Sequence, residues 1–320
     1  MKVLLVGARH PWRMERAIQR ALDRAGHSTV LFDDRRSARL FGRRLTQARL
    51  RRLARRFAPD FVFLSKCLRL DLETVAAVIR GRPNAMWYHD PQWYADQAIP
   101  EIAHITTVGR MVETFFVTGF LREWQDLGLP AAFLPAAGAR EIVPGRPEAA
   151  SATTVAFIGA GYDPTRAEFL RTLGRAVPTR VYGPGWEPWQ AELSWSGGPV
   201  EGPAFATACA SAEYSLGILP ARAAGATTYA SDRMWMVMLA GGLYLGPDAP
   251  GIRDLLHDGE HCFWYRDLDD CIQRIHALGD QPDLRARVRR QGEAFVREHH
   301  TYDARVPFLL ARREWQNPLD

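Results

Sequence analysis

The chain has 320 residues, of which 47% are hydrophobic and 24% are charged, and its formal net charge is +5. This length favours two domains, and no apolar run reaches the ~20 residues of a membrane span, which argues against an integral membrane protein. The start of the chain lacks the pattern of a secretory signal, and four cysteines without a C-x-x-C pair argue against a disulfide framework or a zinc site. We therefore expect a cytoplasmic protein with buried, reduced cysteines.

The first half of the chain alternates apolar runs with stretches of helical spacing, which is the pattern of an α/β domain. Three polar or small positions follow strand ends: Gly7, Lys66 and the pair His89-Asp90. The predicted strands are 3–7, 29–33, 60–64, 85–88, 102–107 and 132–135, and helices are predicted at 15–25, at 71–80 and near Val112.

A second α/β series follows a linker at 143–151, where proline, glycine and small residues interrupt all periodicity. We predict domains at 1–148 and 149–302, and a C-terminal helix at 303–320 that crosses back to the first domain. The two Rossmann-like domains should face a cleft, with ligands at the carboxyl ends of the strands. In the second domain the predicted strands are 154–159, 180–183, 214–219, 243–245 and 262–265, and the helices are 166–175, 232–240, 269–278 and 282–299.

Several segments occur in an order typical of one protein family. They are 134–137, 155–159 followed by Arg166, Tyr182-Gly183-Pro184-Gly185-Trp186, 231–236 leading to 240–242, 259–261, 265–267 and 300–302. In this order they resemble the retaining GT-B glycosyltransferases, most closely the CgeB-like spore-maturation group. The resemblance implies metal-independent transfer of a sugar, with retention, from a nucleoside-diphosphate sugar in the second domain to an acceptor hydroxyl at the first. No cofactor besides the donor substrate is implied.

Arg166 and Arg233 are the candidates for binding the donor diphosphate, because a guanidinium offers a fixed fork of donors to phosphate oxygens. The alternative for each is a solvated surface arginine. Gly159 and Gly161 would let backbone amides approach a phosphate or would simply form a tight turn, and the aromatic residues would stack on the base or belong to the core. The resemblance gives the remaining donor contacts as Tyr182, Gly183, Trp186, Ser231, Met236, Gly241 and Gly242, with Met236 replacing the usual glutamate of the family.

His89 and Asp90 are the candidate catalytic pair on the acceptor side. Asp90 would orient or deprotonate the acceptor hydroxyl and His89 would bind the donor sugar or its phosphate; the alternative is that Asp90 caps the turn before Pro91. Lys66 and Gly7 are candidates for acceptor or phosphate contacts. The D-x-D sequence at 267–269 is predicted to cap a helix, so no metal site is expected.

The segment 35–57 holds ten arginines among scattered leucines and phenylalanines. It predicts a basic, partly amphipathic helix, and the favoured interpretation is a solvated helix whose apolar stripe packs on its own domain. The alternatives are contact with an anionic membrane or an anionic acceptor and, after these, contact with nucleic acid.

Two other functions stay open for the chain as a whole. Met236 allows a non-catalytic nucleotide-binding protein. The acidic pair Asp33-Asp34 allows an NAD-dependent enzyme, although neither half contains a complete G-x-G-x-x-G sequence.

Overall fold

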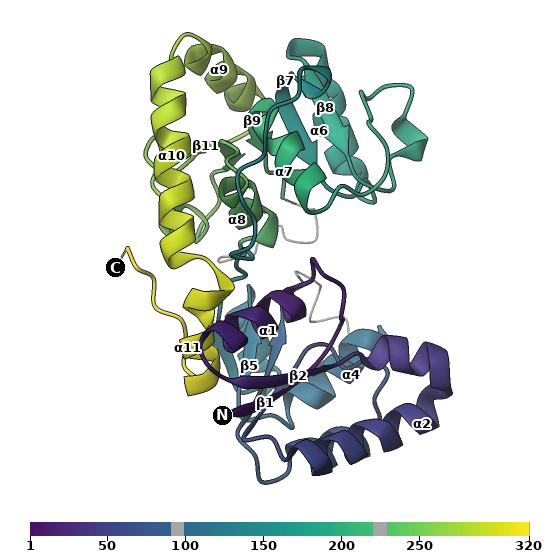
Figure 1. Ribbon diagram of the computed structural model, residues 1–320. Coiled ribbons are helices and arrows are strands. Elements are labelled where there is room, and N and C mark those ends of the chain that lie inside the picture. The colour runs from purple at the N-terminus through teal and green to yellow at the C-terminus, as the bar shows by residue number, and fades with distance from the viewer. Residues whose placement is uncertain (91–98, 220–228, 320) are drawn as a thin grey trace. The chain divides into compact units, whose positions relative to one another are not determined.

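The computed structural model describes residues 1–90, 99–219 and 229–319 (Figure 1). The chain forms two compact units. Unit 1 consists of Met1–Ala139 and Tyr302–Gln316, and unit 2 of Arg140–Thr301 and Asn317–Asp320. The first boundary therefore lies before the linker at 143–151, and the segment after 301 returns to the first unit.

Unit 1 is built on a six-stranded parallel sheet in the order β2-β1-β3-β4-β5-β6. Its inner strands read as continuous apolar runs in the sequence because helices cover both faces of a parallel sheet. The strands are β1 Lys2–Val6, β2 Ser28–Phe32, β3 Phe61–Leu64, β4 Asn84–Tyr88, β5 Phe115–Val117 and β6 Ala131–Phe133. The helices are α1 Met14–Arg24, α2 Asp34–Phe57, α3 Leu72–Ile79, α4 Pro100–Gly109, α5 Leu121–Asp126 and α11 Tyr302–Ala311.

The strand predicted at 102–107 is wrong, since these residues lie in helix α4. Ile102, Ile105 and Val108 are buried at helical spacing, and Pro100 occupies the first turn, where its missing N–H costs nothing. The β-branched residues of this segment favoured a strand by propensity. The helix predicted near Val112 is also wrong; the chain turns there into β5, and both β5 and α5 went unpredicted.

Helix α11 belongs to unit 1 and packs against α1. Arg24 of α1 forms an ion pair with Asp303 at 2.7 Å, and Tyr302 packs edge-on against Trp87 of β4. The buried Arg305 donates from Nε to the Pro135 carbonyl oxygen. Ion pair, ring contact and hydrogen bond together hold the end of the chain on the first sheet.

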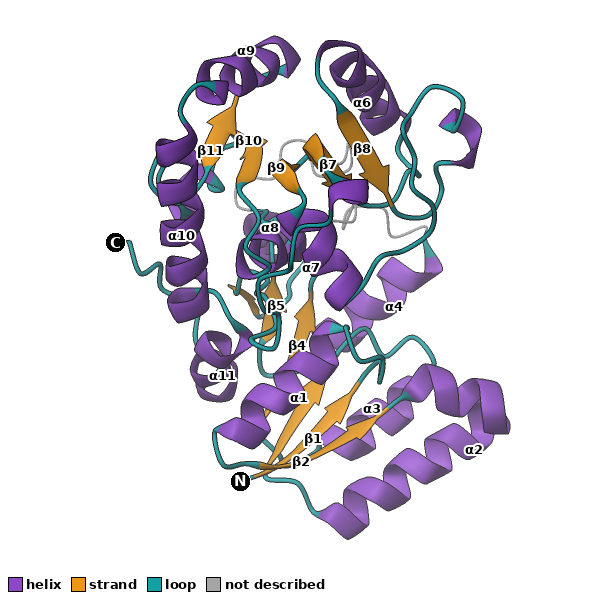
Figure 2. Ribbon diagram, turned by 45° about the horizontal axis from the view of Figure 1, so that its top comes forward, coloured by secondary structure: helices purple, strands orange, loops and turns teal. Residues whose placement is uncertain are grey.

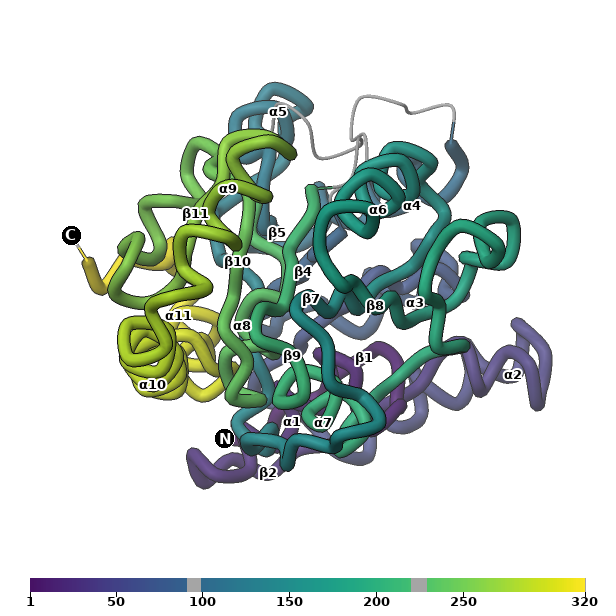
Figure 3. Tube along the Cα trace, turned by 90° about the horizontal axis from the view of Figure 1, so that it is seen from above, coloured from purple at the N-terminus to yellow at the C-terminus, as the bar shows by residue number. Residues whose placement is uncertain are grey.

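Unit 2 has a five-stranded parallel sheet in the order β11-β10-β9-β7-β8, which can be followed from left to right in Figure 3. The sequence predicted α6, α8, α9 and α10 but not α7. The strands are β7 Thr153–Ile158, β8 Thr179–Tyr182, β9 Ala212–Leu216, β10 Tyr244–Pro247 and β11 Phe263–Tyr265. The α-helices are α6 Pro164–Ala176, α7 Pro203–Ala210, α8 Asp232–Leu239, α9 Leu268–Gly279 and α10 Pro282–His299, and the short 3-10 turns include Ala149–Ser151, Glu187–Trp189 and Arg253–Leu255.

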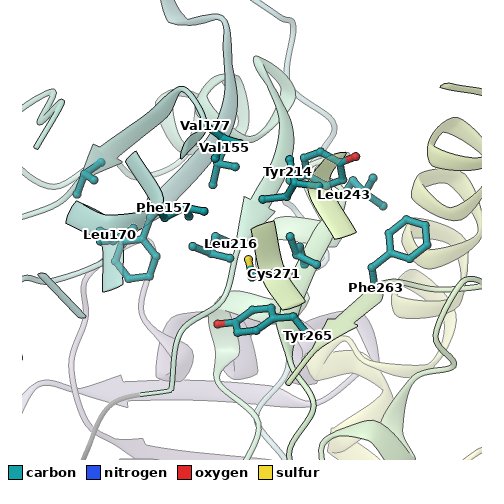
Figure 4. Close-up of a cluster of buried hydrophobic side chains, with 14 of the residues drawn as sticks. Val155, Phe157, Leu170, Val177, Tyr214, Leu216, Leu243, Phe263, Tyr265 and Cys271 are labelled. Carbon is teal, nitrogen blue, oxygen red and sulfur yellow. The ribbon is translucent and has the colours of Figure 1, made fainter. Parts of the chain in front are cut away.

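The core of unit 2 is formed by side chains from all five strands and the flanking helices (Figure 4). Phe157 and Tyr265 belong to it, and they are the next-to-last residue of β7 and the last residue of β11, respectively. Asp267 accepts a hydrogen bond from the Asp270 amide at 2.9 Å, which confirms that the D-x-D sequence caps a helix.

All four cysteines are free and buried, as expected. Among the described residues we find no helix with the length and apolar content needed to cross a bilayer.

Candidate functional site

Both sheets change direction at their first strand. β1 lies between β2 and β3, and β7 lies between β8 and β9, so successive connections leave the first strand towards opposite sides. Ligands of open parallel sheets bind at this switch point, beyond the carboxyl ends of the strands. Each unit therefore has one expected ligand position, at the end of β7 in unit 2 and at the end of β1 in unit 1.

Arg166 lies at the switch point of unit 2, in the first turn of α6. The helix begins there because Pro164 occupies its first turn and the Asp163 carboxylate accepts the Thr165 amide at 3.0 Å. From this position Arg166 Nη2 donates to the carbonyl oxygen of Ile218, in the loop after β9, at 3.0 Å. The guanidinium thus bridges the two loops that diverge at the switch point.

Arg233 approaches the same position from α8. Ser231 caps this helix, and its hydroxyl accepts the Arg233 amide at 3.3 Å. The Arg233 guanidinium stands 5.2 Å from the centre of the Phe157 ring, and that of Arg166 stands 5.8 Å from the same ring. Two half-buried cations therefore converge on one aromatic side chain. Within the described part of the chain, no carboxylate forms an ion pair with Arg233.

A small pocket opens beside these arginines. Burial raises the pKa of Tyr244 and of Tyr265, so both phenols stay neutral, and the Tyr265 hydroxyl donates to the Gly217 carbonyl oxygen at 2.7 Å. Neither tyrosine was predicted for the site; each lies in a strand that reads as core in the sequence. The lining consists of Arg166, Gly217, Ile218, Leu219, Tyr229, Ala230, Ser231, Arg233, Met234, Tyr244, Pro247 and Ile252.

The glycines of the β7 loop tie two loops together. The amides of Gly159 and Gly161 donate to the carbonyl oxygens of Tyr182 and Pro184, both at 2.9 Å. They are therefore engaged, and the expectation that they approach a phosphate is not met. Gly159 instead makes room for Arg233, whose Nη2 would lie 2.7 Å from a Cβ at that position. Gly183 has φ of 124°, and its missing side chain lets the loop pack closely on Gly159. A Cβ at position 183 would lie 2.2 Å from the Gly159 carbonyl oxygen.

The two aromatic residues expected to stack on a base are core residues. Trp186 is fully buried and its indole N–H donates to the Gly159 carbonyl oxygen at 2.7 Å, and Tyr182 is also buried. Neither ring offers a face to a ligand. By contrast, Tyr162 is 76% exposed, and its ring lies against Gly185. Tyr162 was not predicted as a site residue, although it directly follows Gly161.

Gly241 and Gly242 lie at the far end of α8 from Arg233. Their amides donate to Met238 and Val237 carbonyl oxygens, and Gly241 has φ of 76°, so together they end the helix. An eight-residue helix is ~12 Å long, which separates them from the pocket. Met236 is half-buried, one turn after Arg233, and is not among the described residues that line the pocket.

In unit 1 the structure brings together three of the predicted residues at the ends of β3 and β4. Lys66 Nζ forms an ion pair with Asp90, and His89 Nε2 lies 3.8 Å from the other Asp90 oxygen. Lys66 and Cys67 both adopt left-handed backbone conformations, with φ of 42° and 52°. Such conformations are costly and concentrate at functional sites. Pro91, the other part of the predicted turn, lies outside the described residues.

Two buried carboxylates lie in the same pocket, which encloses about 130 Å³. Glu15 accepts a hydrogen bond from the Ser65 hydroxyl at 2.7 Å, and Asp34 accepts the Arg69 amide at 3.2 Å. Burial raises the pKa of Asp34 above its ordinary value. Both residues were missed as site residues, although Asp34 closely follows a predicted strand. The lining also includes Gly7, Ala8, Arg13, Arg35, Lys66, Cys67 and His89.

Gly7 admits the Glu15 side chain rather than a phosphate. A Cβ at Gly7 would lie 2.6 Å from Glu15 Cγ, and the Gly7 amide already donates to the Phe32 carbonyl oxygen at 3.0 Å. The expected phosphate contact of Gly7 is therefore corrected to a packing role.

Comparisons with known proteins agree with this architecture. Residues 166–311 match a family profile described as glycosyl transferase-like. Sucrose-phosphate synthase from Thermosynechococcus elongatus superposes with a TM-score of 0.69 at 10% identity over 98% of both chains. Anabaena HepE in complex with UDP and glucose gives 0.63 at 11% identity, over 98% of this chain and all of HepE.

The T4 phage enzyme BGT in complex with UDP-glucose gives a TM-score of 0.57 at 11% identity over 98% of both chains. No curated protein sequence matches the chain. At these identities the solved structures show a shared fold, and the profile match shows a shared domain in the half that holds Arg166 and Arg233. The chain therefore has the GT-B fold, and its residues 166–311 carry a glycosyl transferase-like domain.

Proposed function

We propose that the chain transfers a sugar from a nucleoside-diphosphate donor, which it binds at the β7 switch point of unit 2. The single observation that carries this proposal is the convergence of Arg166 and Arg233 on Phe157. Fixed guanidinium groups are suited to the diphosphate oxygens, whose negative charge grows as the glycosidic bond breaks. HepE and T4 BGT bind UDP or UDP-glucose, so UDP is the nucleotide to test first.

We propose further that the transfer retains the anomeric configuration and uses no bound metal. The two arginines supply the positive charge that the leaving diphosphate requires. In a retaining reaction that diphosphate takes the acceptor proton, so no strong base is needed at the acceptor. This agrees with an Asp90 carboxylate that is engaged by Lys66. Asp90 then orients the acceptor hydroxyl.

The acceptor, in this proposal, binds at the β1 switch point of unit 1. Glu15 and Asp34 present buried carboxylate oxygens, which suit the hydroxyl groups of a sugar-like acceptor. An arginine-lined cavity adjoins this pocket and shares Ala8 and Arg35 with it. We propose that it binds negative charge on the acceptor outside the reacting hydroxyl.

We also propose that the chain belongs to the CgeB-like group and that it is cytoplasmic. The ordered segments in both halves support the first. Four buried, free cysteines support a reducing compartment for the second.

Calorimetric titration of the full chain with UDP tests the donor site. Loss of one charged hydrogen-bonding partner should weaken binding by about 10- to 100-fold in Arg233→Ala, and similarly in Arg166→Ala. Arg175→Ala is the matched control, because this arginine is exposed on the same helix as Arg166. If Arg233→Ala binds UDP as tightly as the control does, the diphosphate assignment is wrong.

A further inference from the structure

Helix α2 is bent into a corner that is fixed by hydrogen bonds. Gly42 adopts φ of 75° and ψ of 165°, which ends one helical arm and starts the next. Across the bend, the buried Thr46 hydroxyl lies 3.0 Å from the Ser37 hydroxyl and 2.9 Å from the Gly42 carbonyl oxygen. Figure 2 shows the two arms meeting at a corner that points away from the sheet of unit 1. Hydrogen bonds therefore fix the geometry of this bend, which we call the α2 corner.

The corner exposes apolar side chains. Every residue from 39 to 45 is exposed, and Leu40, Phe41 and Leu45 are 57%, 43% and 58% exposed. The apolar stripe that packs α2 on its own domain is made elsewhere, by Leu50 and Ala54. Packing of unit 1 therefore does not explain why three large apolar residues stand at the corner. A partner that takes apolar side chains out of water would explain it.

The same corner borders a strongly cationic cavity of about 740 Å³. Asp33, the one carboxylate in its described lining, forms no ion pair within the described part of the chain, and its two oxygens accept the Arg9 and Arg36 amides at 3.0 and 2.8 Å. In the described part of the chain, the guanidinium groups of Arg36, Arg39 and Arg43 form no ion pair. The charged and polar lining consists of Arg9, His10, Asp33, Arg35, Arg36, Arg39, Arg43 and Arg69.

We propose that the α2 corner docks this protein on an anionic membrane surface. Leu40, Phe41 and Leu45 enter the boundary between headgroups and acyl chains, and the arginines of the cavity bind lipid phosphates. Apolar side chains beside clustered arginines are the composition that binds anionic bilayers peripherally. A nucleic acid would satisfy the arginines but would leave the apolar corner in water, so the membrane accounts for both observations.

Docking has a consequence for the acceptor, which rests on the proposed function. The cavity shares Ala8 and Arg35 with the pocket that holds Lys66 and His89. A lipid phosphate bound in the cavity therefore places the attached group, or a neighbouring headgroup, beside the acceptor pocket. The acceptor in this arrangement belongs to a membrane lipid.

Vesicle flotation with the full chain tests the docking, independently of activity. Vesicles of phosphatidylcholine alone are compared with vesicles containing 30% phosphatidylglycerol. We expect binding to the anionic vesicles only, weakened by at least tenfold when Leu40, Phe41 and Leu45 are all changed to serine. Exchanging Arg36, Arg39 and Arg43 for glutamine should cost about fivefold per arginine and weaken the dependence on salt.

The control carries serine at Leu72 and Val143, two exposed apolar residues outside the corner. Melting temperatures verify that each variant is folded, and UDP titration verifies that the donor site is unaffected. The proposal is overturned if the wild-type chain ignores anionic vesicles, or if the serine corner variant binds them as well as the control does. It is also overturned if duplex DNA displaces the vesicles and binds the corner variant unchanged, which would identify a nucleic-acid surface.

Discussion

The two sheets end in the same topology but gather opposite chemistry at their carboxyl edges. At the end of β7 two guanidinium groups share one aromatic ring, beside phenols that burial keeps neutral. At the carboxyl edge of the first sheet Lys66 pairs with Asp90, and the pocket beside them holds two buried carboxylates together with Arg13 and Arg35. The first edge suits a group that gains negative charge, and the second suits a neutral, hydroxyl-bearing group. In the proposed function the β7 edge is the donor edge and the β1 edge is the acceptor edge. One fold serves both because the loops, and not the sheets, carry the chemistry.

The edges also differ in how their glycines are used. Gly183 of unit 2 lies against the backbone of another loop, whereas Gly7 of unit 1 lies against the Glu15 side chain. The Gly159 carbonyl, directly after β7, is held by the Trp186 indole N–H, while a side chain can rotate. The donor edge should therefore be the more rigid of the two and the less tolerant of change.

Gly183→Ala should have the largest effect. The new methyl group would lie 2.2 Å from the Gly159 carbonyl oxygen, at a φ that alanine rarely adopts. Strain and overlap together should cost about 3–5 kcal/mol. In a thermal melt, unit 2 should lose roughly 10 °C. Gly7→Ala should cost less, about 1–3 kcal/mol in unit 1, since the buried Glu15 side chain must shift but the backbone need not.

Gly198→Ala is the control, because nothing lies within 4 Å of a Cβ at that exposed position. Equal losses for Gly183→Ala and Gly7→Ala would remove the contrast between the two edges.

Lys66→Met should have the next largest effect, on turnover and not on donor binding. It removes the cation that holds Asp90 at the acceptor edge. The loss of one charged hydrogen-bonding partner corresponds to a fall in kcat of about 10- to 100-fold. Transfer assays at saturating donor measure it, and UDP titration should give an unchanged Kd. Lys66→Arg should recover part of the activity.

A rise in the Kd for UDP that matches the loss of turnover would place Lys66 at the donor instead. The acceptor and donor edges would then not be separate sites.

Periodicity predicted the fold well because buried parallel strands leave unbroken apolar runs. It failed at residues 102–107, where β-branched residues fill the buried side of a helix. A three-residue strand such as β5 is too short to give a periodic signal at all. The local pattern indicates which residues are buried, and tertiary packing decides between helix and strand for such segments.

The site was predicted in part. Arg166, Arg233 and Lys66 stand out in the sequence because charged residues next to strand ends or in helix first turns are conspicuous, and the structure places them in the lining of two pockets. The hydrogen bond from the Trp186 indole to the Gly159 carbonyl oxygen was not predicted, because a contact between two loops leaves no regular spacing in the sequence. Glu15 was missed for a related reason: its pattern is that of an exposed helix position, and only the absence of a side chain at Gly7 lets it turn inwards.

Asp34→Asn should give the smallest effect, an increase in stability that depends on pH. Burial raises the pKa of the Asp34 carboxyl above its ordinary value of 3.8 in the folded chain. Between that value and the raised pKa the folded state binds more protons than the unfolded state, so stability falls as pH rises through this window. Asparagine keeps an oxygen to accept the Arg69 amide but does not ionise. Urea denaturation at pH 4 and at pH 7 should therefore give a gain that is larger at pH 7. If the free energy of unfolding rose by the same amount at both pH values, the buried charge of Asp34 would not be the cause of the instability.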